Sequence, residues 1–303
     1  MTGSAPPHAR AEERRPAVSS ESGATGRRRR SWRGGSGNLV TGGTIVVLVV
    51  LLALVSLVWT PYDPIPVNPA GRLLGMTSAH PLGTDLYGRD VVSLLMYGAR
   101  ISLLVGVAAV VIAMVIGVPV GVLAGMRGGW VDQVLMRATD VALAFPALLL
   151  TIVFGAVWGA GTTTAVIALG ISAAPSFARV SRSGTLQIMS REYVVAARAA
   201  NRGPFWIATR HVLPNIAGLV IVQSSVAFGI AVLAEAALSY LGFGTTPPTP
   251  SWGRMLQEGQ SYLFDHPMLV LWPGIAIALT VLGLNLLGDG LRDRLDPRAG
   301  GAR

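Results

Sequence analysis

Few side chains in this sequence are of the types that perform chemistry. The 303 residues include no cysteine, which excludes disulfides and thiolates, and the four histidines are scattered without the spacing of metal ligands. All 24 basic residues are arginine. Without a lysine the chain cannot form a Walker-type phosphate loop or a lysine Schiff base. No nucleophile arrangement is recognisable, so we expect a protein that is not an enzyme and binds no cofactor.

Most of the chain is instead apolar. Hydrophobic residues make up 51% and charged residues 13%, and the mean hydropathy is +0.56. Several runs approach the roughly 20 apolar residues that cross a bilayer. We therefore predict an all-α membrane protein with six transmembrane helices, at about 39–60, 101–125, 141–159, 163–180, 215–239 and 267–287. Tryptophans near the edges of these spans are expected to anchor them at the membrane interface: Trp59, Trp130, Trp252 and Trp272.

The arginines are distributed unevenly over the two sides of these spans. One side holds 20 arginines, and the other side holds 4. The side with 20 comprises both termini, the connection between the second and third spans, and the segment between the fourth and fifth spans. Positive residues concentrate on the cytoplasmic side of membrane proteins. We therefore expect both termini to be cytoplasmic, and we assign the basic run Arg27–Arg30 to membrane topology rather than to nucleic-acid binding.

The segment "REYVVAARAANRGPFWIATRHVLPN" (191–215) lies between two spans on that side. Ser190 and Glu192 favour a helix start, and the helical spacing of Tyr193, Ala196, Ala197 and Ala200 predicts one smooth face. "NRGP" (201–204) predicts a turn, since Asn and Gly tolerate the left-handed conformation, and a second short helix should end at Pro214. The pattern suits either a connector lying along the lipid headgroups or a docking element for a cytoplasmic partner.

Four separated blocks resemble one family. "EYVVAARAANRG...RHVLPN" is similar to the cytoplasmic loop motif of ABC importer permeases, on the residues Glu192, Tyr193, Ala196, Ala197, Arg198, Ala199, Leu213 and Pro214. The blocks at 80–106, 235–256 and 273–298 resemble the second permease type of the dipeptide, oligopeptide and nickel branch. The resemblance extends from about residue 39 to 298. Two positions depart from the motif, because Asn201 replaces its glycine and Val195 an acidic residue.

The resemblance implies a type I ABC importer permease fold in the bacterial inner membrane. A coupling loop (181–214) would fit the ATPase subunits through Glu192, Tyr193, Ala196, Ala197, Arg198, Ala199, Asn201 and Gly203. The implied partners are a second permease, two cytoplasmic ATPases that use ATP and Mg, an external substrate-binding protein and the lipid bilayer, with no nucleic acid. The implied cargo is a peptide, with a nickel chelate as the alternative within the family.

Two questions remain open at this level. An ion-gradient-driven secondary transporter would need carboxylates inside the membrane, and Glu235 is the clearest of them. Glu235 could face the translocation path or hold neighbouring groups such as Ser239. Outside the spans, Arg89 could pair with Asp85 or Asp90 in a capped turn.

The expected division of the chain follows from these assignments. It comprises a disordered basic tail (1–38), a first transmembrane helix (39–60), an extracytoplasmic segment (61–98), a permease core (99–290) and a cytoplasmic tail (291–303).

Overall fold

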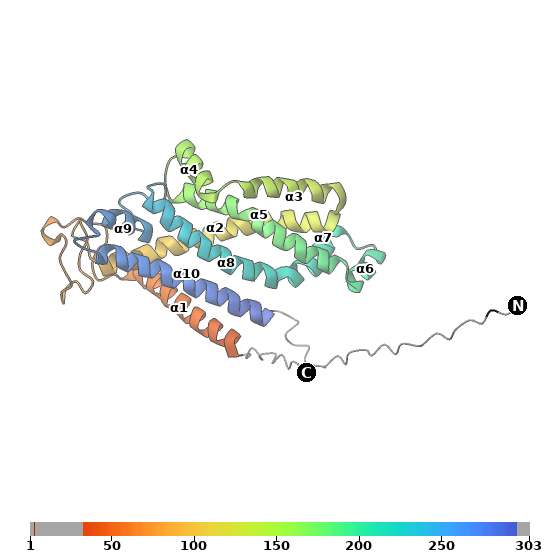
Figure 1. The fold of residues 1–303 in the computed structure, drawn as a ribbon, viewed down its shortest axis with the longest axis horizontal. Helices are drawn as coiled ribbons and strands as arrows, with labels where there is room; N and C mark the ends of the chain where they lie inside the picture. Colours follow the sequence, from red (N-terminus) through yellow and green to blue (C-terminus); the bar gives the residue numbers. More distant parts are fainter. Residues whose placement is uncertain (1–2, 4–32, 296–303) are drawn as a thin grey trace. The chain divides into compact units, whose positions relative to one another are not determined.

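The computed structural model describes Gly3 and residues 33–295, so most of the predicted N-terminal tail and part of the C-terminal tail lie outside the described residues. Apart from one isolated bridge between Thr84 and Asp90, the described residues form helices, turns and loops. The fold is all-α, as predicted (Figure 1).

The long helices carry most of the chain. They are α1 (Arg33–Val58), α2 (Val91–Arg127), α3 (Gly129–Ala144), α4 (Ala147–Trp158), α5 (Thr162–Met189), α8 (Leu213–Tyr240) and α10 (Met268–Leu295). Short elements connect them, namely η1 (Pro69–Gly71), α6 (Glu192–Ala199), α7 (Pro204–Ile207), the π-helical turn η2 (Ala208–Val212), α9 (Trp252–Gly259) and η3 (Gln260–Tyr262).

Five helical segments are long and apolar enough to cross a membrane: 37–58, 91–127, 162–189, 204–240 and 268–294. The predicted third span (141–159) is not a continuous helix. Phe145 is extended (φ −84°, ψ 122°), Pro146 follows it, and α3 and α4 meet at 81°. Proline lacks the backbone N–H and disfavours helical conformation in the residue before it, which accounts for the break. The number of spans is six if this bent pair counts as one.

Helices α2 and α5 approach each other closely along a row of small residues. The facing positions of α2 are glycines four residues apart, Gly117, Gly121 and Gly125. A Cβ on Gly121 would lie 2.8 Å from the Cβ of Ser181, and one on Gly125 would lie 2.8 Å from the Cβ of Thr185. Such small-residue rows let helix backbones pack at short range where no hydrophobic effect drives association. The sequence "GVPVGVLAG" (117–125) thus brings α2 into close contact with α5.

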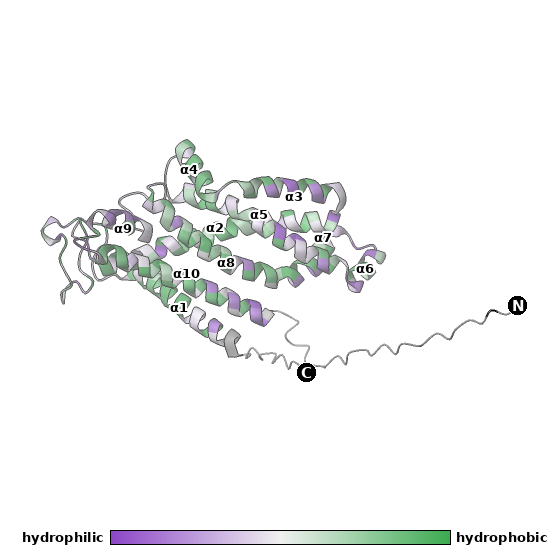
Figure 2. Ribbon diagram, viewed as in Figure 1, coloured by the Kyte–Doolittle hydropathy of each residue, from purple (hydrophilic) through white to green (hydrophobic). Residues whose placement is uncertain are grey.

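Figure 2 colours most of the ribbon of the membrane-spanning helices green for hydrophobic residues, whereas purple, hydrophilic residues are frequent on α3, α6 and the end of α10. Large hydrophobic side chains stay exposed along the spans, among them Leu51, Val115, Val157, Ile230 and Leu279. In a water-soluble protein so much exposed apolar surface would cause association. Lipid is the solvent that suits it.

Trp252 is not an interface anchor, contrary to prediction. It is 1% exposed, and its indole Nε1 donates to the Leu95 carbonyl at 3.0 Å. Gly98 makes room for it, since a Cβ there would lie 2.6 Å from the Trp252 ring. The residue fixes the short helix α9 against the first turns of α2. Those turns belong to one continuous helix from Val91, so α2 begins within the segment predicted to lie outside the core (61–98).

Candidate functional site

The predicted coupling loop (181–214) contains the end of α5, then α6 and α7, and leads into α8 (Figure 1). Ser190 is not the N-cap of α6. Its hydroxyl donates to the Gln187 carbonyl at 3.0 Å, and Arg191 occupies the N-cap position without a side-chain cap. Glu192 in the first turn and Arg198 in the last suit the positive and negative ends of the helix dipole.

Helix α6 is anchored by one face and leaves the other open. Val194 (0% exposed) and Ala197 (9% exposed) face inward and join the core cluster that also holds Ile207 and Val212. The predicted smooth face is therefore partly wrong, because Ala197 is buried. The period of the helix places Glu192, Ala196 and Ala199 on the opposite side, where all three are exposed.

A tight turn closes α6. Asn201 has φ +55°, the Asn201 N–H donates to the Arg198 carbonyl at 2.9 Å, and the Arg202 N–H donates to the Ala197 carbonyl at 3.0 Å. This pair of bonds is the Schellman arrangement of a helix end, which needs a left-handed residue at the position of Asn201. The left-handed turn predicted at Asn201 is confirmed. Gly203 does not share it, since Gly203 is extended (φ −66°) and precedes α7.

The second short helix does not end at Pro214. Helix α7, the π-helical turn and α8 continue one another, and Pro214 lies in the first turn of α8. The wider π turn accommodates a proline that has no N–H to donate. The Asn215 side chain donates to the His211 carbonyl at 2.6 Å. The coupling loop is thus joined to α8 without an intervening flexible segment.

Three aromatic rings tie α6 to this junction. The Tyr193 and His211 centroids are 5.4 Å apart, and those of Trp206 and His211 are 5.0 Å apart. The Arg202 guanidinium lies 5.1 Å from the centroid of Trp206. Sequence reasoning missed Trp206 and His211, because their contact depends on the π turn rather than on α-helical spacing.

Ion pairs connect α3 to α5 near the same end of the spans. Arg182 binds Asp132 with both Nε (2.5 Å) and Nη2 (2.6 Å), and Arg179 binds Asp140 at 2.6 Å. The Arg179 and Asp140 side chains are about half exposed, at 53% and 50%. These two ion pairs hold α3 to α5.

Glu235 lies inside the bundle, 1% exposed. Its carboxylate accepts from the hydroxyls of Ser102 (3.0 Å), Ser239 (2.7 Å) and Thr245 (3.4 Å), and Ser239 Oγ in turn accepts from the Thr245 N–H at 2.9 Å. These partners come from α2, α8 and the loop after α8. The carboxylate joins three parts of the chain in this conformation.

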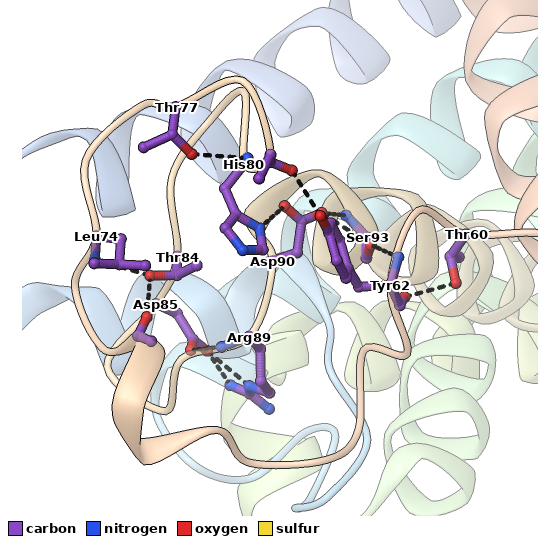
Figure 3. Close-up of polar contacts among 12 residues, drawn as sticks. Thr60, Tyr62, Leu74, Thr77, His80, Thr84, Asp85, Arg89, Asp90 and Ser93 are labelled. Atoms are coloured by element: carbon purple, nitrogen blue, oxygen red, sulfur yellow. Dashed lines mark hydrogen bonds and ion pairs between the residues drawn. The ribbon is translucent and has the colours of Figure 1, made fainter.

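A second polar cluster, the Arg89 network, holds the segment before α2 (Figure 3). Arg89 donates from Nε to Asp85 at 2.7 Å and from Nη2 to Glu258 on α9 at 2.7 Å, and its Nη2 forms an ion pair with Asp85 at 2.6 Å. Arg254 donates to Glu258 at 2.8 Å. Asp90 does not pair with Arg89. It caps α2 by accepting from the Ser93 N–H at 2.8 Å.

His80 and Tyr62 extend this ordering along the segment. His80 Nδ1 lies 3.0 Å from Asp90, and the Tyr62 N–H donates to Ser93 Oγ at 3.0 Å (Figure 3). Residues 60–90 have little regular secondary structure, but these contacts with Asp90 and Ser93 hold them against the start of α2.

The sequence of this chain is similar to those of known membrane transport proteins. Residues 117–301 match the family described as binding-protein-dependent transport system inner membrane component, so the match includes the coupling loop and Glu235. The chain belongs to this family.

Several relatives of this inner membrane component are similar over most of their length. The dipeptide transport system permease protein DppC of Alkalihalophilus pseudofirmus is 39% identical over 86% of this chain and 85% of its own. The glutathione transport system permease protein GsiD of Pectobacterium atrosepticum is 41% identical over 86% of each chain. The nickel transport system permease protein NikC of Escherichia coli is 37% identical over 84% of this chain and 91% of its own.

Among solved structures, the inward-facing MetNI methionine ABC transporter resembles this inner membrane component. The TM-score is 0.56, and the match covers 67% of this chain and 96% of the MetNI chain at 20% identity. At that identity the likeness concerns the fold, which is the type I ABC importer permease fold expected from the sequence.

Proposed function

We propose that this chain is the permease subunit of an ATP-driven importer for peptides. It forms a translocation path with a second permease, receives cargo from a substrate-binding protein and is driven by two ATPase subunits. The relatives named for dipeptide and glutathione transport support the peptide class. The nickel permease is also similar, at 37% identity, and gives no reason to prefer a metal chelate.

The outward face of α6 is the observation that carries this proposal. Glu192, Ala196 and Ala199 form a small, exposed surface, while Val194 and Ala197 fix the helix to the bundle. Alanine side chains let another surface approach closely, and an anchored helix transmits the displacement that a partner imposes. We assign this face to the ATPase subunit and the coupling loop to the cytoplasm, in agreement with the arginine distribution.

The arrangement suggests how ATP hydrolysis elsewhere would act on this chain. The α6 helix is packed against residues of α7, the π turn and α8, with no flexible joint between α7 and α8. Movement of the ATPases would therefore displace together the end of α5 and the start of α8, which lie next to α6 in the chain. The chain itself supplies the path and the coupling surface and performs no chemistry.

Co-purification tests the proposal. A tagged chain extracted in mild detergent should bring a second permease and the ATPases with it. Ala199→Arg places a long charged side chain on the proposed docking face and should remove the ATPases while the second permease stays. Ala138→Arg, at an exposed alanine of α3, is the matched control and should keep both. Retention of the ATPases by Ala199→Arg would contradict the assignment of the face. Solute transport by the chain alone without ATP would contradict the importer.

A further inference from the structure

The structure contains a large apolar groove beside the coupling loop, on a different side of α6 from the proposed docking face. The α2–α7 groove has a volume of about 690 Å³ and lies between the end of α2 (118–127), Met189 at the end of α5, and residues 198–213. Small-molecule sites commonly measure about 300–1,000 Å³. We infer that this groove binds one anionic phospholipid of the surrounding membrane.

The walls of the groove suit an acyl chain. Most lining side chains are apolar, among them Val118, Val122, Leu123, Phe205 and Leu213. Phe205 is 81% exposed and Leu123 is 43% exposed, so the described chain leaves this apolar surface uncovered. In a family of inner membrane components, an uncovered apolar groove at the end of a span lies within reach of lipid tails.

Three arginines on the lining supply the charge that selects a headgroup. Arg127 ends α2, Arg198 lies in the last turn of α6, and Arg202 directly follows Asn201. All three are exposed, and among the described residues none of them forms an ion pair with a carboxylate. Arg198 Nη2 lies 3.9 Å from Met189 Sδ, and the Arg202 guanidinium lies over Trp206, so each already contacts a neighbour of the groove.

Unpaired guanidinium groups beside an apolar cavity match a phosphate ester attached to a hydrocarbon chain. Arginine binds phosphate oxygens through paired N–H donors, and basic pockets between transmembrane helices bind anionic headgroups. An acidic protein segment would satisfy the charge but would leave the apolar walls exposed. The lipid fills both parts of the site.

This inference goes beyond the proposed function and does not depend on it. Glu192, Ala196 and Ala199 do not line the groove, so an ATPase on that face and a lipid in the groove can be present together. Arg198 is the one groove residue that also belongs to the set expected to fit the ATPase. The inference needs only that the chain lies in a bilayer.

Native mass spectrometry of the full-length chain provides the test. The chain is titrated in detergent with phosphatidylglycerol or with phosphatidylcholine of the same acyl chains, and bound lipids are counted. We expect one phosphatidylglycerol to bind more tightly than phosphatidylcholine. The triple variant Arg127→Gln, Arg198→Gln, Arg202→Gln should weaken phosphatidylglycerol binding by about fivefold per arginine, or roughly a hundredfold in all. The control Arg191→Gln, Arg210→Gln, Arg292→Gln removes equal charge from exposed arginines outside the groove and should leave binding unchanged.

A second variant tests the apolar part separately. Leu123→Trp enlarges an exposed side chain within the groove and should reduce phosphatidylglycerol binding while all three arginines remain. Soluble glycerol 3-phosphate should not compete, because it lacks the acyl chain. Equal loss in the two triple variants, equal binding of the two lipids, or competition by glycerol 3-phosphate would overturn the inference. So would crosslinking of Leu123→Cys to the second permease in the purified complex, since a protein would then occupy the groove.

Discussion

The Arg89 network offers a direct test of whether burial determines how much an ion pair contributes to the stability of this protein. Arg89→Met keeps much of the side-chain volume and removes the charge that neutralises Asp85 and Glu258. The side chains of Arg89, Asp85 and Glu258 are 8%, 9% and 12% exposed. Removing one partner of a buried pair costs about 3–5 kcal/mol, because the remaining charge is left without compensation in a poorly solvated site.

The structure narrows this range. Glu258 keeps its bond to Arg254, and the Asp85 carboxylate still accepts from the backbone N–H groups of Tyr87 and residue 89, both at 2.8 Å. The lower end, about 3 kcal/mol, is therefore expected. Arg179→Met is the matched control: it breaks a pair of the same 2.6 Å length whose side chains are about half exposed, where about 0–1 kcal/mol is typical.

The assay is reversible unfolding of the purified chain, followed by tryptophan fluorescence during transfer from a mild detergent to sodium dodecyl sulfate. Asp85→Asn and Glu258→Gln added to Arg89→Met should recover part of the loss, because neither buried carboxylate then carries an unpaired charge. The recovery is only partial, since Arg254, 19% exposed, loses its own carboxylate partner. If Arg89→Met costs no more than Arg179→Met, or if the added neutral residues recover nothing, burial does not govern these pairs and the reasoning fails.

Three further substitutions address the spans and the coupling loop. Gly121→Val should destabilise the chain by about 1–3 kcal/mol or more, because the added methyl groups meet α5. Gly274→Val is the control and should be nearly neutral in the same unfolding assay, since Gly274 has open space around it. Asn201→Val should cost about 1–2 kcal/mol, since a β-branched residue resists the left-handed turn, and Asn201→Gly should not; equal effects would show that the turn is absent. Glu235→Ala leaves its hydroxyl partners unsatisfied, so it should destabilise the chain by about 1–3 kcal/mol and lower the thermal unfolding temperature. Glu235→Gln should be tolerated, because its amide can still bond those hydroxyls. An equal loss in both Glu235 variants would show that the negative charge itself is required.

The sequence predicted the spans well because their signal is local. Long apolar runs require no knowledge of neighbours, and the expected positions of the first, fourth, fifth and sixth spans fall largely within α1, α5, α8 and α10. The Asn201 turn was equally accessible, since few residues other than glycine adopt that conformation. Where the residue type alone restricts the backbone, the prediction agrees with the structure.

The predictions were wrong where a contact with another residue of the chain determines the position of a side chain. Trp252 was expected to be an interface anchor because it was placed near the edge of a span, but it packs against Gly98 and is buried. Ser190 suited an N-cap by type, yet its hydroxyl bonds within the preceding helix. The third span was predicted as one helix although it contains Pro146, and the α3–α4 pair bends there by 81°. The Arg89 to Glu258 bond joins residues 169 positions apart, and no local pattern reports it.

The backbone conformations indicate which joints could permit movement in the proposed transport cycle. Between Thr162 and Tyr240, Asn201 is the one described residue with positive φ, and α7 passes into α8 without a break. The α3–α4 pair has a glycine with positive φ at each end: Gly128 precedes α3, Gly129 begins it, and Gly159 follows α4. The bend at Pro146 lies between the two helices. Glycine allows backbone rotation that other residues resist. A displacement of α6 would therefore move α5 and α8 as a unit, and the angular change would be taken up at the two ends of α3–α4.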